Sequence, residues 1–148
     1  MSEVKRRLQF VKAYLDNAEE RIALAEFSRA RGFHHNAVRL CQEAIELCLK
    51  AILRLYGVEY PKSHDVAPLL RRYSFLFPKW FQEKISDIAR YSRDLSHNRV
   101  PAMYGDEEAE IPPSELYDEK DSEEAIVKAR VVLELCLKLF EEKASSLE

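Results

Sequence analysis

The chain has 148 residues, of which 47% are hydrophobic and 33% charged, and its formal net charge at pH 7 is −3. This length fits a single domain over residues 1–148 that buries a core without disulfides or metals, and the composition excludes a disordered chain. No run approaches the roughly 18 to 20 apolar residues of a membrane span, and the N-terminus lacks the apolar core of a signal peptide, so we expect a cytoplasmic protein without membrane contacts.

The first half of the chain predicts two long helices. Apolar residues recur at steps of three and four, and the whole sequence contains only three glycines, which is typical of an all-α protein. We expect a first helix over residues 3–30, ended by Gly32, and a second over residues 34–56, ended by Gly57. The second has the widest apolar face, with small residues along its middle, and this indicates the central helix of a bundle.

Prolines divide the second half. Pro68 and Pro78 each suit the first turn of a helix, the former after an N-cap at Asp65. After Asn98 the helical pattern fails for more than twenty residues, so we expect a long loop there. The last helix should begin near Asp121 or Ser122. Together these elements predict an all-α, antiparallel up-and-down bundle of four to five helices with a long loop before the last helix.

The charge is unevenly distributed. Residues 106–124 contain ten acidic residues and one lysine, a local charge of −9, so the remainder of the chain carries +6. Because this acidic segment follows Arg90, Arg93 and Arg99 in the sequence, we expect it to fold back over those arginines.

Motifs for metal and cofactor chemistry are missing from the sequence. It contains no glycine-rich phosphate loop, no HExxH and no CxxC, so we expect no cofactor and no metal. The three cysteines do not form a disulfide framework: Cys41 and Cys48 would lie about 10 Å apart along one helix, too far to bridge. We expect all three thiols to be buried.

The stretch ARYSRDLSHNR, residues 89–99, places several cationic or titratable groups on one helix face. Arg90 and His97 differ by about 20° around the helix axis, and Arg93 and His97 by about 40°. An imidazole beside guanidiniums suits RNA cleavage without a metal, because the histidine transfers protons while arginine stabilises charge on the phosphate. The alternative is an ordinary solvated helix face, on which an ion pair between Arg90 and Asp94 contributes only tenths of a kcal/mol.

A second stretch carries a family resemblance. AVRLCQEAIELCLKAILRLYGVEYPKSHDVAPLL, residues 37–70, resembles the central signature of HEPN domains: an amphipathic helix, a glycine turn at Gly57, and then Pro61, a small polar residue, His64 and Asp65 before a leucine-rich helix. The resemblance implies a helical bundle that commonly forms a homodimer. It also implies a nucleotide or RNA ligand and, as a partner, a minimal nucleotidyltransferase in a toxin–antitoxin-like pair.

Many HEPN proteins are metal-independent ribonucleases that carry an arginine, four to six residues and then a histidine. Arg90 and His97 satisfy the six-residue spacing, and a dimer would supply the second histidine that acid–base catalysis requires. Tyr91 replaces the usual small polar residue, however, and a long acidic loop separates His97 from the last helix. We therefore expect first a dimerising nucleotide- or RNA-binding module, and as the alternative an endoribonuclease that uses Arg90 and His97. The remaining residues expected to contact nucleotide or RNA are Arg93, Asp94, Arg99 and Tyr104.

Overall fold

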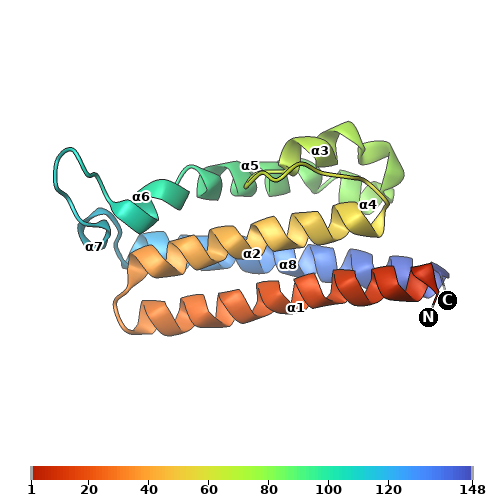
Figure 1. Ribbon diagram of the computed structural model, residues 1–148, viewed down its shortest axis with the longest axis horizontal. Coiled ribbons are helices and arrows are strands. Elements are labelled where there is room, and N and C mark those ends of the chain that lie inside the picture. The colour runs from red at the N-terminus through yellow and green to blue at the C-terminus, as the bar shows by residue number, and fades with distance from the viewer. Residues whose placement is uncertain (1, 148) are drawn as a thin grey trace.

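The structure is a computed structural model and describes residues 2–147. Three long helices form its body and lie side by side along the long axis of the molecule (Figure 1): α1 (Glu3–Ala30), α2 (His34–Leu55) and α8 (Glu119–Leu147). Gly32 and Gly57 follow α1 and α2 with φ angles of 82° and 73°. Both glycines adopt the left-handed conformation that ends helices, which confirms the two expected helix ends.

A second layer of shorter helices packs on the side of α2 opposite to α1 (Figure 1). In chain order its elements are α3 (Ala67–Arg72), the 3₁₀ turn η1 (Ser74–Leu76), α4 (Lys79–Gln82), α5 (Ile85–Ser96), α6 (Arg99–Tyr104) and α7 (Pro113–Leu116). The predicted all-α bundle is confirmed. No helix within residues 2–147 combines the length and the apolar character that crossing a bilayer requires.

Helix α2 is the central element of the core. It contacts α1, α8 and the second layer, and its small residues Ala37, Ala44 and Ala51 are almost completely buried. Small side chains at these positions let neighbouring helices approach closely. The three cysteines are buried and free, as expected from their number and spacing.

Two helix starts differ slightly from the sequence expectation. Helix α3 begins at Ala67 and its N-cap is Val66, one residue after the expected Asp65. The carboxylate of Asp65 accepts a hydrogen bond from the N–H of Ala67 at 3.0 Å just before the helix. Helix α8 begins at Glu119, earlier than Asp121. The reason is a reciprocal cap, in which the N–H groups of Asp118 and Asp121 each donate to the other's carboxylate, at 2.9 and 3.0 Å.

The long connection before α8 is present, and it contains the two short helices α6 and α7. Between them, the backbone of Asp106 exchanges two hydrogen bonds of 2.9 Å with that of Ile111. We call residues 106–111 the acidic loop. A Cβ atom on Gly105 would lie 2.1 Å from the carbonyl oxygen of Ile111, and its φ is 69°, so only glycine fits there.

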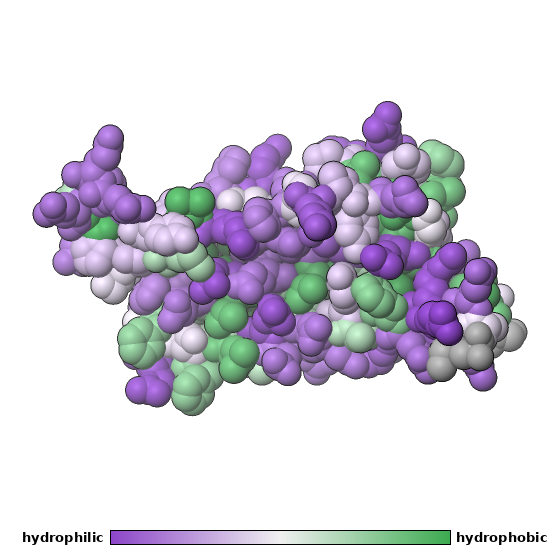
Figure 2. Space-filling model, in the orientation of Figure 1, coloured by the Kyte–Doolittle hydropathy of each residue, from purple (hydrophilic) through white to green (hydrophobic). Residues whose placement is uncertain are grey.

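The acidic segment of residues 106–124 was expected to fold over the arginines of residues 90–99, and for its first part, the acidic loop, this expectation was wrong. The loop projects from the end of the molecule beyond α6 (Figure 1), where its surface is hydrophilic (Figure 2). Among residues 2–147, no ion pair joins it to Arg90, Arg93 or Arg99. The physical reason is local: the two hydrogen bonds between Asp106 and Ile111 close the loop on itself.

Candidate functional site

Helix α5 presents the predicted site residues on its solvent side. Its apolar residues Ile85, Ile88 and Leu95 are buried against the bundle, which leaves Arg90, Arg93 and His97 exposed. Arg90 and His97 are separated by about 10 Å along the helix axis. We call the exposed side of α5 that carries these three residues the α5 face.

The three residues of the α5 face differ in their contacts. The guanidinium of Arg90 lies 3.1 Å from the carboxylate of Asp87 and 5.4 Å from the ring centre of Tyr91. Arg93 and His97 take part in no ion pair among residues 2–147. His97 follows the last residue of α5. Arg93 and His97 are therefore the groups on this face that are open to a ligand.

The carboxylate of Asp94 faces α8 rather than Arg90. It lies 3.6 Å from the ammonium of Lys128, so this ion pair joins α5 to the last helix. Asp94 thus does not orient Arg90 in this structure, and its expected role as a nucleotide or RNA contact remains a prediction.

The other two predicted contacts lie on α6. Arg99 is half-buried, and its guanidinium donates to the side-chain oxygen of Gln42 at 3.1 Å. Tyr104 is 57% exposed at the end of α6. The structure therefore groups Arg90, Arg93 and His97 on α5, while Arg99 is directed towards α2 and Tyr104 lies next to the acidic loop.

A polar network that the sequence reading missed connects α2 to the chain before α3. Its centre is the carboxylate of Glu46, whose side chain is only 18% exposed. Glu46 accepts hydrogen bonds from Lys50 at 3.0 Å and from Gln42 at 3.2 Å, and Nδ1 of His64 lies 3.0 Å away. Burial alone would raise the pKa of Glu46, but hydrogen bonds from Lys50, His64 and Gln42 outweigh it and lower this pKa.

The residues next to His64 fix the position of α5. The hydroxyl of Ser92, which is buried on α5, donates to the carboxylate of Asp65 at 2.7 Å. The hydroxyl of Ser96 donates to the main-chain oxygen of His64 at 3.3 Å. His64 and Asp65 thus hold α5 in place through hydrogen bonds from Ser96 and Ser92.

One signal in the sequence could have revealed this network. Gln42, Glu46 and Lys50 are polar residues spaced by four on the helix with the widest apolar face, so they share one side of α2. Such a polar row on a central helix requires partners, because buried polar groups are almost always hydrogen-bonded. The identity of those partners was not readable, since His64 and Arg99 are 18 and 57 residues away.

The described part of the chain offers no site for a metal ion. Within residues 2–147, no three His, Cys, Asp or Glu side chains converge in a way that could hold one. The α5 face carries guanidinium and imidazole groups, which as chemical types bind phosphate oxygens by charge and hydrogen bonding.

Solved structures share the fold. The chain superimposes on the crystal structure of ST0689, described as an archaeal HEPN homologue, with a TM-score of 0.69 and 25% identity; the match covers 88% of this chain and 97% of that one. It also superimposes on TT1696 from Thermus thermophilus, with a TM-score of 0.71 and 23% identity over 90% of this chain and 97% of that one. The second likeness is one of fold alone.

Sequence relationships identify the family. Over 140 residues the chain is 25% identical to a protein of Methanocaldococcus jannaschii named "Putative toxin MJ1304", and the match covers 92% of this chain and 91% of the relative. The HEPN domain pattern matches residues 11–140, which include all of α2 and α5. The family expected from residues 37–70 is confirmed: the chain belongs to the HEPN domain family.

Proposed function

We propose that this HEPN protein binds RNA or nucleotides through the α5 face, as a homodimer that acts in a toxin–antitoxin-like pair with a minimal nucleotidyltransferase. The observation that carries the proposal is the exposure of Arg93 and His97 without ion-pair partners among residues 2–147. An arginine without a partner provides a fork of donors that fits phosphate. The toxin name of the relative from M. jannaschii supports the toxin–antitoxin setting.

Arg90 can also contribute to this surface, because only a weak ion pair has to be broken to free it. Its ion pair with Asp87 joins two side chains that are each 55% exposed, and exposed pairs contribute only about 0–1 kcal/mol. A phosphate group can therefore displace Asp87 from Arg90. If Arg90, Arg93 and His97 all contact phosphates, the α5 face binds a nucleic-acid backbone along about two turns of α5.

An apolar patch at the end of α1 supports the dimer. Leu24, Phe27 and Phe33 are large hydrophobic residues that are 45–61% exposed, and Figure 2 shows hydrophobic surface gathered over this end of α1. Contiguous exposed apolar surface marks sites of protein association. We propose that a second copy of the chain covers this patch.

The position of the patch favours binding over catalysis. Helix α1 lies on the opposite side of α2 from α5 (Figure 1), so a dimer formed through Phe27 would keep the two copies of His97 apart. Acid–base cleavage of RNA needs two proton-transferring groups near one phosphate. The endoribonuclease that uses Arg90 and His97 is therefore the second candidate, supported by the exposed imidazole of His97 on the same face as Arg90.

The binding proposal is tested by fluorescence anisotropy with a labelled single-stranded RNA. Arg93→Gln should weaken binding, and the slope of log K against log salt should fall by about 0.7, the value for one lost phosphate contact on a single strand. Arg72→Gln, an exposed arginine of α3, removes the same charge elsewhere and should change the slope little. Equal effects of the two substitutions would refute a specific role for the α5 face.

The catalytic candidate and the dimer have separate tests. If the chain is a ribonuclease, the wild-type protein should cleave RNA in EDTA and His97→Ala should not; intact RNA with the wild-type protein removes this candidate. For the dimer, light scattering during gel filtration should show a dimer for the wild-type chain and a monomer for Phe27→Glu. A wild-type monomer at high concentration would contradict the homodimer.

A further inference from the structure

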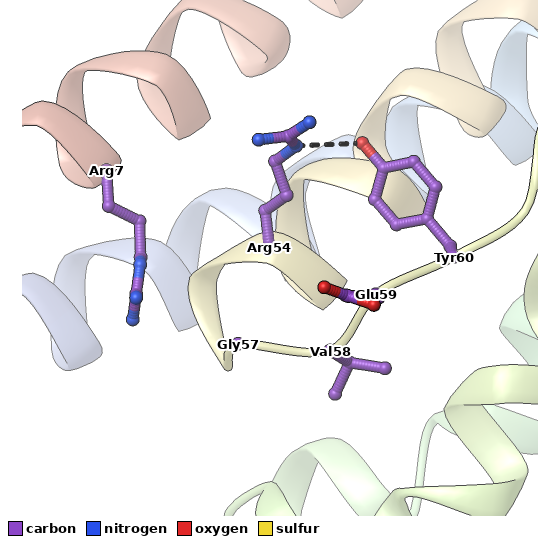
Figure 3. Close-up of a pocket in the computed structure, with 6 residues that line it drawn as sticks. All are labelled: Arg7, Arg54, Gly57, Val58, Glu59 and Tyr60. Atoms are coloured by element: carbon purple, nitrogen blue, oxygen red, sulfur yellow. Dashed lines mark hydrogen bonds between the residues drawn. The ribbon is translucent and has the colours of Figure 1, made fainter.

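A groove unconnected with the α5 face lies where the start of α1 meets the end of α2. Two adjoining hollows form it and share Arg7 and Arg54 in their lining. One has a volume of about 450 Å³ and is bordered by the chain that follows α2 (Figure 3). The other, of about 390 Å³, is bordered by Arg6 and Phe10 of α1. We call this site the Arg54 groove. Its size lies within the range of small-molecule sites.

Arg54 is held in one orientation by its neighbours. Its Nε donates a hydrogen bond of 3.0 Å to the hydroxyl oxygen of Tyr60, which Figure 3 marks, and its guanidinium lies 4.2 Å from the ring centre of Phe10. These contacts use Nε and one face of the guanidinium. The two terminal amino groups make no hydrogen bond among residues 2–147, so they form a pre-oriented pair of donors. Pre-orientation reduces the entropy lost when a ligand binds.

The groove has guanidinium groups that form no ion pair with a carboxylate among residues 2–147. Arg6 and Arg7 come from α1, and Arg7 lies on the side of Arg54 away from Tyr60 (Figure 3). Glu3 and Glu59 also border the groove, yet within residues 2–147 neither forms an ion pair with these arginines. Three arginines from two helices, without ion pairs, favour an anionic ligand with several oxygen atoms.

The aromatic rings indicate which part of a ligand this groove receives. Phe10 packs against Arg54 and against Tyr14, whose ring centre is 4.7 Å away. Tyr60 is occupied by its hydrogen bond to Arg54 and by Lys50, whose ammonium lies 5.6 Å from the ring centre. These rings thus hold cations in place, and the ring faces that contact Arg54 and Lys50 are not available for stacking a base. The groove is suited to phosphate groups.

We propose that the Arg54 groove binds a pyrophosphate-like group, with Arg54 and Arg7 as the contacting residues and Tyr60 as the positioning residue. Two sources share this chemistry: the phosphates of a free nucleotide and the phosphorylated 5′ end of an RNA. Neither source requires the α5 face, so the proposal stands apart from the function proposed above.

Isothermal titration calorimetry of the full chain at low salt tests the site with inorganic pyrophosphate, ADP and adenosine. Pyrophosphate and ADP should bind, and adenosine should not. The double substitution Arg7→Gln with Arg54→Gln should weaken pyrophosphate binding about tenfold or more, since it removes the paired donors. The matched control, Arg71→Gln with Arg72→Gln, removes two exposed arginines of α3 and should change binding less than about twofold. Equal losses in both double variants, or no binding of pyrophosphate by the wild-type chain, would overturn the proposal.

The role of Tyr60 has its own readout. Tyr60→Phe keeps the ring and removes the hydroxyl that holds Nε of Arg54. In a ¹H–¹⁵N spectrum of arginine side chains, the Nε–H signal of Arg54 is the one missing from Arg54→Gln. Pyrophosphate should shift this signal in the wild-type chain, while sodium chloride of equal ionic strength should not. In Tyr60→Phe the signal should move before any ligand is added, and pyrophosphate should bind about threefold more weakly. An unmoved signal would remove Tyr60 from the site.

The source of the phosphates is decided by anisotropy with one RNA sequence that carries either a 5′-monophosphate or a 5′-hydroxyl. Tighter binding of the phosphorylated RNA, lost in the double variant at Arg7 and Arg54, assigns the groove to RNA ends. Equal binding of the two RNAs, together with binding of ADP, assigns it to free nucleotides. If ADP, pyrophosphate and the 5′-phosphate all bind equally to the wild-type chain and the double variant, the groove has no specific ligand and the proposal fails.

Discussion

The network around Glu46 allows a quantitative prediction. Glu46→Gln keeps the size of the side chain and removes its charge. In the native chain this carboxylate lies within 3.0–3.2 Å of donors on Lys50, His64 and Gln42. The amide of the variant has one acceptor oxygen instead of two and no charge, so at least one of the three hydrogen bonds is lost and the others weaken.

The magnitude follows from burial and charge. A hydrogen bond to a charged group contributes about 1.5–3 kcal/mol, but His64 is 56% exposed and solvent screens its share. We therefore expect Glu46→Gln to lower the free energy of unfolding by about 1–2 kcal/mol at pH 7. For a chain of this size, that corresponds to a decrease of roughly 2–8 °C in Tm.

The sign of the pH dependence is also fixed. Because the hydrogen bonds lower the pKa of Glu46 below its value of 4.5 in the unfolded chain, the unfolded chain takes up a proton first as the pH falls. The stabilisation by this carboxylate is thus fully present above about pH 4.5 and is lost as the pH falls through the folded pKa. The difference in Tm between wild type and Glu46→Gln should be largest at neutral pH and smaller at pH 3.

Thermal unfolding followed by circular dichroism at pH 7, 4.5 and 3 measures this difference. Glu20→Gln, an exposed substitution on α1, is the control and should behave like wild type at every pH. A Glu46→Gln variant that unfolds at the wild-type temperature at pH 7 would refute the reasoning. So would a difference that stays constant down to pH 3.

Three further predictions concern other parts of the chain. Burial raises the pKa of the Cys41 thiol to about 12, so iodoacetamide at pH 8 should label Cys41 only after unfolding, as mass spectrometry would show; labelling of the native chain would contradict its burial. Gly105→Ala should destabilise the turn by about 1–3 kcal/mol, because φ is positive and the new Cβ would meet the carbonyl of Ile111. The acidic loop of this variant should therefore be cut faster by a protease. An unchanged rate of cleavage would contradict the tight turn. Ser92→Ala removes the hydrogen bond to the carboxylate of Asp65 and should lower the free energy of unfolding by about 1.5–3 kcal/mol, as denaturant unfolding would measure. If α5 contacts RNA, the same substitution should also weaken RNA binding in the anisotropy assay.

The long helices were predictable because their determinants are local. Gly32 and Gly57 end α1 and α2 at the expected points, and the three- and four-residue spacing of apolar residues identifies the faces that are buried. Helix α6 was missed because its six residues are too few to show the three- and four-residue spacing of apolar side chains. They also include Pro101, which usually interrupts a helix. Its position depends on contacts with α2, among them that of Arg99 with Gln42.

The site was predictable only in part, for a similar reason. The exposure of Arg90, Arg93 and His97 follows from the helical repeat of α5, which places Ile88 and Leu95 in the core. Long-range pairings such as that of Asp94 with Lys128 carry no local signal. The same holds for the Arg54 groove. Its walls come from the start of α1 and the end of α2, which are far apart in the sequence.

The polar row on α2 also limits how the chain can change in length. Gln42, Glu46, Lys50 and Arg54 follow one another at intervals of four, so one side of a single helix supports both α6 and the Arg54 groove. Inserting one residue between Glu46 and Lys50 would rotate Arg54 by about 100° relative to Gln42. Arg54 and Arg99 could then not both keep their partners. Insertions in α2 should therefore destabilise the fold. The acidic loop, which is exposed to solvent, should tolerate insertions.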